Sequence, residues 1–167
     1  MLEEFEEDSE NFNRPPSFFP YNGSEQMPES KTGNREPVEV TIEGIFAAES
    51  NGNIHRFVLL TDGERKVSIL IGPFEAQAIT MPLEGAQPDR PMTHDLIKTV
   101  LDKFNGAITK ILIDDLWSTT YYAKIFIQCQ KEEIIIDSRP SDAIALAVRY
   151  NAPIYVSDNI LEQNNTE

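Results

Sequence analysis

The sequence has few of the features on which several large classes of protein depend. It contains a single cysteine, Cys129, so no disulfide can form within the chain. No apolar run approaches the ~18 residues that a membrane-spanning helix needs. The first ten residues hold six acidic side chains and no lysine or arginine. These absences argue against a disulfide-rich secreted domain, a membrane protein and a signal peptide, and we expect a cytoplasmic protein.

Basic side chains are also scarce, at 14 against 28 acidic ones, and the net charge is −14. Residues 1–36 carry −6, residues 37–156 carry −5 and the last eleven residues carry −3. Nucleic-acid binders usually draw much of their affinity from lysine and arginine contacts to phosphate. The composition therefore gives no global electrostatic case for nucleic-acid binding, although a local basic patch stays open.

Familiar catalytic motifs are missing as well. There are two histidines, His55 and His94, and no cysteine–histidine metal spacing, phosphate-binding glycine loop, His-Glu-x-x-His or Gly-x-Ser-x-Gly sequence. The 167 residues, 40% of them hydrophobic and 25% charged, are nevertheless enough for one globular domain with a real core. Any chemistry must come from a less familiar arrangement.

Composition divides the chain into three parts. Residues 1–36 are acidic, contain prolines and lack periodicity, so we interpret them as a flexible tail that can bind an unknown partner through Phe18–Tyr21 or simply remain solvated. Residues 37–157 form the predicted domain, and residues 158–167 are interpreted as a polar tail.

Alternating apolar residues and turn dipeptides predict a strand-rich domain. Strands are expected at 38–46, 54–61, 66–71, 108–116, 121–129, 133–137 and 153–156, and helices at 74–81, 93–104 and 140–148. Asn51-Gly52 and Asp62-Gly63 are hairpin signals between the first three strands, Thr93 is the expected N-cap of the second helix, and Pro82 should close the first. The predicted fold class is α+β, a β-rich single domain.

The two halves of this domain match at a distance of 67 residues. The run 73–79 and the run 140–146 both read Pro-x-acid-Ala-x-Ala-aliphatic, and each half has the order strand–strand–strand–helix. The match indicates either an internal duplication or shared helix-start chemistry. The first junction, Ile71-Gly72-Pro73, looks inert, so we expect function at the second.

The second junction, Asp137–Asp142, precedes six apolar residues, 143–148. Proline suits the first turn of a helix because its φ is fixed and it has no N–H, and a carboxylate there favours the helix dipole. A helix without a polar face over two turns should be buried nearly all round. Its polar start is the most promising place for chemistry.

A second polar run, Asp89–Leu96, also has an Arg-Pro step before a helix. Together the two runs supply four carboxylates, two guanidinium groups, one imidazole and two hydroxyls: Asp89, Asp95, Asp137 and Asp142; Arg90 and Arg139; His94; Thr93 and Ser141. Carboxylates can bind Mg²⁺ or Mn²⁺, guanidinium groups clamp phosphate, and histidine suits acid–base work near neutral pH. These are the parts of a metal-assisted phosphodiesterase.

Each part also has a structural explanation. Acids at Asp95 and Asp142 stabilise helix starts whatever the function, and Arg139 with Asp137 can be an ion pair that fixes a loop. Aromatic residues on or beside a two-faced strand, at Trp117, Tyr121, Tyr122 and Phe126, further predict a homo-oligomer that covers both faces.

These runs, with the segment 152–156, resemble the bifunctional nuclease domain family over about residues 38–156. The resemblance implies a compact, often self-associating α+β domain with DNase and RNase activity in some members. We therefore expect a nuclease that cleaves DNA or RNA with little sequence preference. In it His94, Asp95, Asp137 and Asp142 are catalytic, Arg90, Arg139 and Ser141 bind phosphate, and the four aspartates, Asp89 included, hold Mg²⁺ or Mn²⁺. The alternative is a non-catalytic, self-associating module that binds a small ligand or a protein.

Overall fold

The computed structural model describes residues 36–164, which form one seven-stranded mixed sheet and four helices. The strands are β1 (Val38–Ser50), β2 (Asn53–Thr61), β3 (Lys66–Ile71), β4 (Gly106–Trp117), β5 (Thr120–Cys129), β6 (Glu132–Ser138) and β7 (Ile154–Val156). The helices are α1 (Pro73–Leu83), α2 (Thr93–Lys103), α3 (Pro140–Tyr150) and α4 (Asp158–Asn164). The α+β, strand-rich class is confirmed. The predicted tail at 1–36, with Phe18–Tyr21, lies outside the described residues except for Glu36.

The seven expected strands and three expected helices are all present, with differences at their ends. Met92, not Thr93, is the N-cap of α2, because the Asp95 carboxylate accepts the Met92 backbone N–H at 2.8 Å and so fixes the first turn. Helix α1 continues one residue past Pro82. Pro82 has no N–H to donate to the carbonyl of Ala78, four residues earlier, and Arg149 Nη1 donates to that carbonyl at 2.8 Å instead.

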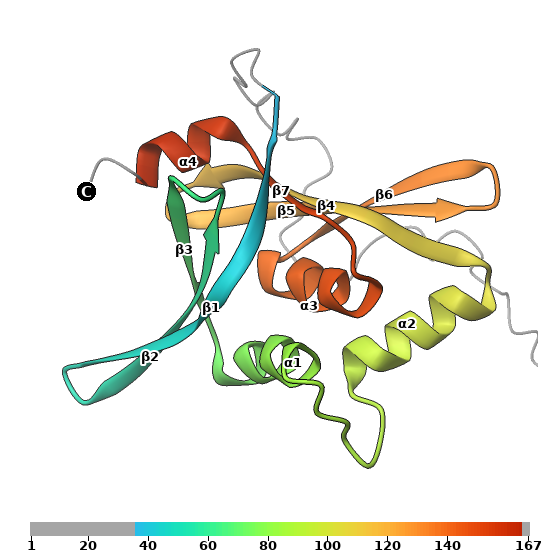
Figure 1. Cartoon of the computed structure of the whole chain (residues 1–167), viewed down its shortest axis with the longest axis horizontal. Coiled ribbons are helices and arrows are strands. Elements are labelled where there is room, and N and C mark those ends of the chain that lie inside the picture. The colour runs from blue at the N-terminus through green and yellow to red at the C-terminus, as the bar shows by residue number, and fades with distance from the viewer. Residues whose placement is uncertain (1–35, 165–167) are drawn as a thin grey trace, which may run out of the picture. The chain divides into compact units, whose positions relative to one another are not determined.

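The sheet order is β3-β2-β1-β7-β4-β5-β6, so each half of the chain contributes one antiparallel three-stranded unit and β7 joins them (Figure 1). β7 pairs antiparallel with β1 and parallel with β4. Residues that lie 67 positions apart in the two halves also match in burial. Val58 and Leu60 of β2 are 0% exposed, and Ile125 and Ile127 of β5 are 5% exposed. The element order and the core positions of the two halves therefore repeat.

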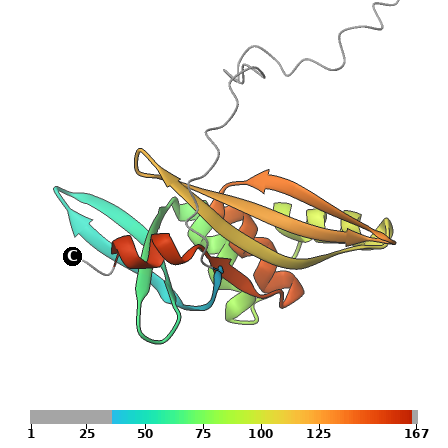
Figure 2. The same ribbon diagram turned by 90° about the horizontal axis from the view of Figure 1, so that it is seen from above.

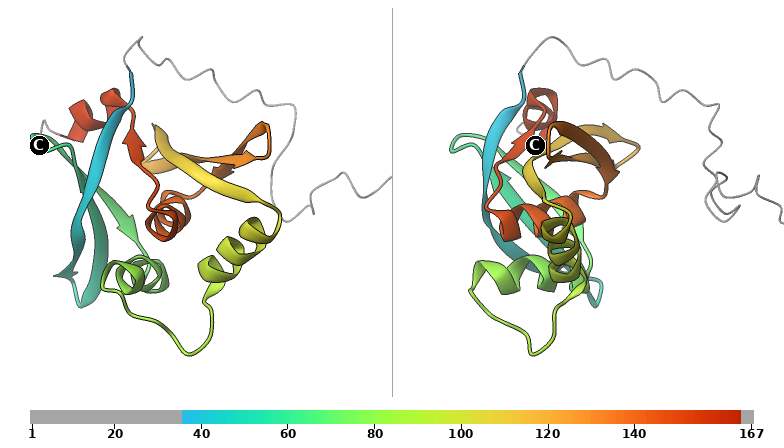
Figure 3. Two further views of the ribbon diagram at one scale, coloured as in Figure 1. Left: turned by 45° about the vertical axis from the view of Figure 1, so that its right-hand side comes forward. Right: turned by 90° about the vertical axis from the view of Figure 1, so that its right-hand side faces the viewer.

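Helix α3 lies at the centre of the fold, as its composition predicts. Figure 3 shows it end-on between the two strand groups, and it contacts α1, α2, β4 and β5. Ala143, Ile144, Ala145 and Ala147 are completely buried. Small alanine side chains let neighbouring elements approach α3 from several sides. This packing fixes the position of the polar N-terminal end of α3. Figure 2 shows α2 and α3 on one side of the layer formed by β4, β5 and β6.

The interpretation of residues 158–167 as a polar tail is wrong for 158–164. These residues form α4, in which Ile160 is 3% and Leu161 0% exposed. Arg65 donates to Asp158 at 2.7 Å and ties the helix start to the β2–β3 turn. Two apolar residues were too few for the sequence pattern to predict a helix, but their burial fixes one.

Several large apolar side chains remain exposed, among them three on α2 and three on β6 but none on β5. Tyr121 and Phe126 are partly buried, since the Tyr121 hydroxyl bonds Asn164 of α4 and Lys110 covers the Phe126 ring. Trp117 is exposed. Within residues 36–164, none of the helices has both the length and the apolar composition that crossing a bilayer requires.

Candidate functional site

Three elements that are distant in sequence bring polar side chains together at the start of α3. His94, in the first turn of α2, places its Nε2 atom 3.2 Å from Oδ1 of Asp142. Arg139, the N-cap of α3, donates to the same carboxylate through Nε at 2.7 Å and Nη2 at 3.0 Å. The two polar runs of the sequence therefore meet, through His94 on one side and Arg139 with Asp142 on the other.

Electrostatics keeps Asp142 and Arg139 ionised. Burial opposes charge on Asp142, but the hydrogen bonds from Arg139 and His94 outweigh it, so the pKa of Asp142 lies below its ordinary value. The Asp142 carboxylate in turn raises the pKa of the Arg139 guanidinium. A fixed negative charge beside the His94 ring orients the ring.

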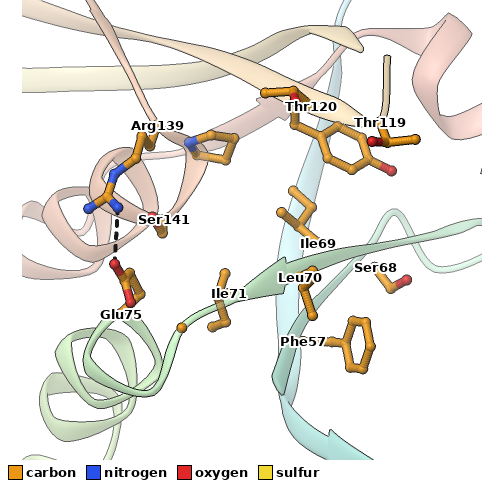
Figure 4. A pocket seen from close by; sticks show the side chains of 13 residues that line it. Phe57, Ser68, Ile69, Leu70, Ile71, Glu75, Thr119, Thr120, Arg139 and Ser141 are labelled. Atoms are coloured by element: carbon orange, nitrogen blue, oxygen red, sulfur yellow. Dashed lines mark hydrogen bonds and ion pairs between the residues drawn. The ribbon is translucent and has the colours of Figure 1, made fainter. Parts of the chain in front are cut away.

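The first helix start also joins the cluster, through a residue that the sequence analysis missed. Arg139 Nη1 donates to Glu75 Oε1 at 3.0 Å, so one guanidinium bridges the starts of α1 and α3 (Figure 4). Glu75 lies 67 residues before Asp142 and occupies the same position of the repeat. The first helix start therefore contacts the second, which the expectation of an inert first junction did not include. The repeat itself was the signal, because it carries an acid at both helix starts.

An open pocket of about 510 Å³ lies between the two helix starts. Arg139, Ser141 and Glu75 line one side, and residues from β2, β3 and the β4–β5 turn line the other (Figure 4). Ser141 is 8% exposed and its hydroxyl has no hydrogen-bond partner among the described residues. The buried hydroxyl of neighbouring Ser138 is also unpartnered in this part of the chain. A buried hydroxyl facing a pocket is available to a ligand.

A second ion pair joins Asp95, the residue after His94, to Arg149 of α3. Arg149 donates from Nε to Asp95 Oδ1 at 2.6 Å and from Nη1 to the carbonyls of Ala78 and Ala145, both at 2.8 Å. Its side chain is only 5% exposed. Burial opposes ionisation of Asp95, but Arg149 and the Met92 N–H lower its pKa overall. Arg149 thus ties α1, α2 and α3 together. It follows Asp142 by two helical turns, and that spacing could have indicated it.

The other expected site residues do not join this cluster. Asp89 and Arg90 are exposed in the loop before α2, and Thr93 is exposed at its first position. Asp137 pairs in register with Lys124, and Ile136 beside it pairs with buried Ile125. Because neighbouring side chains of a strand point to opposite faces, Asp137 lies on the sheet face away from α3.

The donor set does not fit a preformed metal centre. Among residues 36–164, no three histidine, cysteine, aspartate or glutamate side chains gather closely enough to hold an ion. Asp95 and Asp142 are engaged by arginines, and Asp89 and Asp137 stand apart. Mg²⁺ often binds through only one or two carboxylates together with substrate phosphate, so metal assistance stays a prediction with no step assigned to it.

The fold and this cluster define a class: a strand-rich α+β domain whose central buried helix opens on a histidine–aspartate–arginine site. Comparison with known sequences specifies it further. The chain belongs to the bifunctional nuclease domain family, whose profile matches residues 58–167.

Two kinds of relative support this assignment. An uncharacterised protein of Mycobacterium tuberculosis is 34% identical over 125 residues, which cover 75% of this chain and 74% of the relative. Bifunctional nuclease 1 of Oryza sativa subsp. japonica is 26% identical over 115 residues, covering 66% of this chain but 35% of the rice protein. Bifunctional nuclease 2 of the same plant is 34% identical over 70 residues, 22% of its length.

Proposed function

We propose that this protein is a nuclease that hydrolyses phosphodiester bonds of DNA, RNA or both with little sequence preference. The observation that carries the proposal is the contact of His94 with Asp142 while Arg139 grips the same carboxylate. An acid–base group, its orienting carboxylate and a cation for phosphate thus lie side by side, and the cation, Arg139, also lines the pocket. The family and the names of its rice members point to the same reaction.

In the proposed mechanism His94 acts as the proton carrier. When Nε2–H donates to Asp142, Nδ1 is left as the proton acceptor of the neutral ring. Nδ1 takes a proton from water, the resulting hydroxide attacks phosphorus, and the P–O bond to the leaving oxygen breaks. The imidazolium then returns its proton to that oxygen. Asp142 stabilises the imidazolium while it exists.

In this proposal, residues at the start of α3 bind the phosphate. The Arg139 guanidinium is 65% exposed and can turn from Glu75 toward a phosphate oxygen. The Ser141 hydroxyl and the positive end of the α3 dipole lie beside it. Asp95, held by Arg149, acts as a positioning residue because it fixes the first turn of α2, which carries His94. Asp89, Arg90 and Asp137 are outside this proposal.

Cleavage of labelled single-stranded RNA and DNA by the full chain tests the proposal. His94→Ala should lower the rate by about 10²–10⁴-fold, the range typical of a lost acid–base group. The matched control is His55→Ala, because His55 is the other histidine and is exposed on β2, outside the cluster. Equal rates for wild type and His94→Ala would rule out this site. Assays with Mg²⁺, Mn²⁺ or EDTA decide whether a metal takes part.

A binding module is the second candidate, and the charge of the domain favours it. Residues 37–156 carry a net −5, which repels a phosphate backbone, and Glu75 lies on the wall of the pocket. A small neutral ligand would avoid this repulsion. Failure to cleave or bind either nucleic acid at low salt, where electrostatic contacts are strongest, would favour this candidate.

Self-association and a cytoplasmic location complete the proposal. The location rests on the single cysteine, which fits a reducing compartment. Self-association rests on the exposed apolar residues of α2 and β6.

A further inference from the structure

The pocket between the two helix starts has two ends that differ in chemistry. Arg139, Ser141 and Glu75 lie at one end, and the proposed mechanism uses only these (Figure 4). The other end is formed by three large apolar or aromatic side chains and three side chains that carry a hydroxyl: Phe57, Leu70 and Tyr121, and Ser68, Thr119 and Thr120. Within residues 36–164, none of the side chains that line this second end is charged.

The apolar side chains of the second end offer flat surfaces to a ligand. Leu70 is 60% exposed and pairs across β2 and β3 with Phe57, so the two side chains lie next to each other on one sheet face. Tyr121 lines the pocket from β5, and its hydroxyl donates to Asn164 at 3.1 Å, which holds the ring in place. Nucleobases stack on such surfaces whatever their sequence, since every base has a π-face. This end therefore suits a nucleobase.

Neutral hydrogen-bonding groups surround these flat surfaces. The hydroxyls of Ser68, Thr119 and Thr120 have no hydrogen-bond partner in the part of the chain that the structure describes. β3 pairs only with β2 in the described sheet, so backbone N–H and C=O groups of 68–71 that face away from β2 border the pocket. Donors and acceptors without charge match the ring nitrogens, amino groups and carbonyls of a base.

The β4–β5 turn places Thr119 at the pocket in a strained conformation. The φ of Thr119 is +70°, and no other β-branched residue among 36–164 has a positive φ. The β1–β2 turn has Asn51 and Gly52 at such angles, which suit them. A β-branched residue in this region is an outlier, and such strain clusters at ligand sites. Because glycine would form the turn more easily, the strain points to a role for the Thr119 side chain.

The charged end fits one phosphate and opposes a second. The Arg139 guanidinium is 65% exposed, and the buried Ser141 hydroxyl has no partner among the described residues. The Glu75 carboxylate beside them repels any further negative group. The volume, about 510 Å³, lies within the range of small-molecule sites, ~300–1,000 Å³. The pocket thus matches a ligand with one phosphate and one flat, neutral body.

We propose that the uncharged end of the pocket is a base subsite, formed by Phe57, Ser68, Leu70, Thr119, Thr120 and Tyr121. It binds an unpaired nucleobase whose phosphate is held by Arg139 and Ser141. The ligand is a nucleoside monophosphate unit, either free or within a strand. The position of the phosphate rests on the proposed function, and the base subsite adds the part of the substrate that is recognised. A base inside a duplex is stacked and paired, and it must leave the stack to enter.

Calorimetric titration of the full chain tests the base subsite. Adenosine 5′-monophosphate should bind about 5–150-fold more tightly than ribose 5-phosphate, which carries the phosphate but no base. Leu70→Ser should remove this difference without changing the affinity for ribose 5-phosphate. The matched control is Ile54→Ser, which changes a 58% exposed apolar residue of β2 outside the pocket and should leave both affinities unchanged.

Three results of this titration would overturn the base subsite. They are equal affinities of the two ligands for wild type, an affinity for adenosine 5′-monophosphate that Leu70→Ser leaves unchanged, and no binding of either ligand at millimolar concentration. An extended peptide could instead pair with the edge of β3 and place its carboxylate at Arg139. Tighter binding of an N-acetylated tetrapeptide with a free carboxyl end than of adenosine 5′-monophosphate would therefore also refute the proposal.

Thr119→Gly separates a role in binding from a role in the turn. Glycine adopts a φ of +70° without strain, so the midpoint of thermal unfolding should not fall, whereas the affinity for adenosine 5′-monophosphate should. A lower midpoint with unchanged affinity would mean that Thr119 serves the turn alone, and would remove it from the base subsite.

NMR of backbone amides locates the base. Adenosine 5′-monophosphate should shift the signals of 68–71 and 118–121 in addition to those of 139–143, and ribose 5-phosphate should shift only the last group. Shifts confined to 139–143 with both ligands would place the base outside the pocket and overturn the proposal.

Competition and cleavage separate the base subsite from the nuclease. Displacement of adenosine 5′-monophosphate by a short single strand would assign the base subsite to a strand, and its absence would assign it to a free nucleotide; either result keeps the base subsite. Base-dependent binding without cleavage of any strand would refute the nuclease alone. Cleavage that needs His94, together with equal affinities for the two small ligands, would refute the base subsite alone.

Discussion

The starts of α1 and α3 share their residue spacing and differ in their surroundings. Both begin Pro-x-acid, and their acids, Glu75 and Asp142, bind the same Arg139. Asp142 receives two bonds from Arg139 and one contact from His94, whereas Glu75 receives a single bond. The additional partners of Asp142 make the start of α3 the candidate catalytic site. Glu75, at the start of α1, makes only a supporting contact.

The helices that follow these starts differ in burial, and α3 is buried more deeply than α1 at two pairs of equivalent positions. At equivalent positions α3 has Ile144, which is completely buried, and α1 has Gln77, which is exposed. Ser141 is 8% exposed, and its equivalent Phe74 is 79% exposed. A repeated sequence pattern therefore produced one central helix and one peripheral helix, since only one of two equivalent helices can occupy the middle of the fold.

The largest expected difference is in cleavage. Asp142→Asn should lower the rate about 100-fold or more, because it removes the charge that orients His94 and Arg139. Glu75→Gln should lower it by less than about tenfold, since Arg139 keeps its bidentate partner. Initial rates on one labelled strand measure both variants. Equal losses would mean that the two acids share one role and would contradict the functional difference between the two helix starts.

The second difference is in stability. Ile144→Ala should cost about 2–5 kcal/mol of unfolding free energy, because it leaves a cavity beside α3. Gln77→Ala at the equivalent position should change it by less than about 0.5 kcal/mol. Urea unfolding followed by circular dichroism compares them. A small loss for Ile144→Ala would show that the centre of the fold can collapse around α3.

The third difference is in pH dependence. The pKa of Asp142 is lowered on folding, so its stabilisation is present above its unfolded pKa, about 4, and is lost as pH falls through the folded value. Asp142→Asn should therefore flatten the fall in stability below about pH 4. Asp89→Asn, which changes an exposed carboxylate in the loop before α2, is the control. Parallel stability curves for wild type and Asp142→Asn would contradict the ion pair.

The smallest expected effect comes from Gly72, the counterpart of Arg139 in the first half. A methyl group there would collide with the Glu75 carboxylate, which folds back over the glycine. The φ of Gly72 is −76°, so alanine fits the backbone. Because the Glu75 side chain can swing away, Gly72→Ala should cost under about 0.5 kcal/mol and loosen only the bond to Arg139. A larger loss would show that Glu75 is rigidly placed.

Much of the fold could be read from local patterns. The turn signals at Asn51-Gly52 and Asp62-Gly63, the alternating strands and the Pro140 start all correspond to observed elements. The sequence did not predict helix α4, because two adjacent apolar residues, Ile160 and Leu161, cannot show a helical periodicity. The N-cap of α2 was misplaced because a backbone bond to Asp95 decided it.

The candidate site could be predicted only in part. His94, Arg139, Ser141 and Asp142 belong to runs whose chemistry was visible, and the structure brings them to one helix start. Asp137 has the same kind of side chain but points to the other sheet face, since strand alternation outweighs nearness in sequence. Glu75 joined the site because α1 packs against α3.

The sequence by itself determined which elements form, α4 excepted, since helix starts, turns and alternation depend on neighbouring residues. It also determined the acidity of the chain and the supply of acid–base groups. Only the tertiary structure decided which of those groups meet, that α2 shows its apolar side to the outside, and that one arginine serves both helix starts. Those outcomes depend on packing between residues far apart in the chain, and no local pattern encodes them.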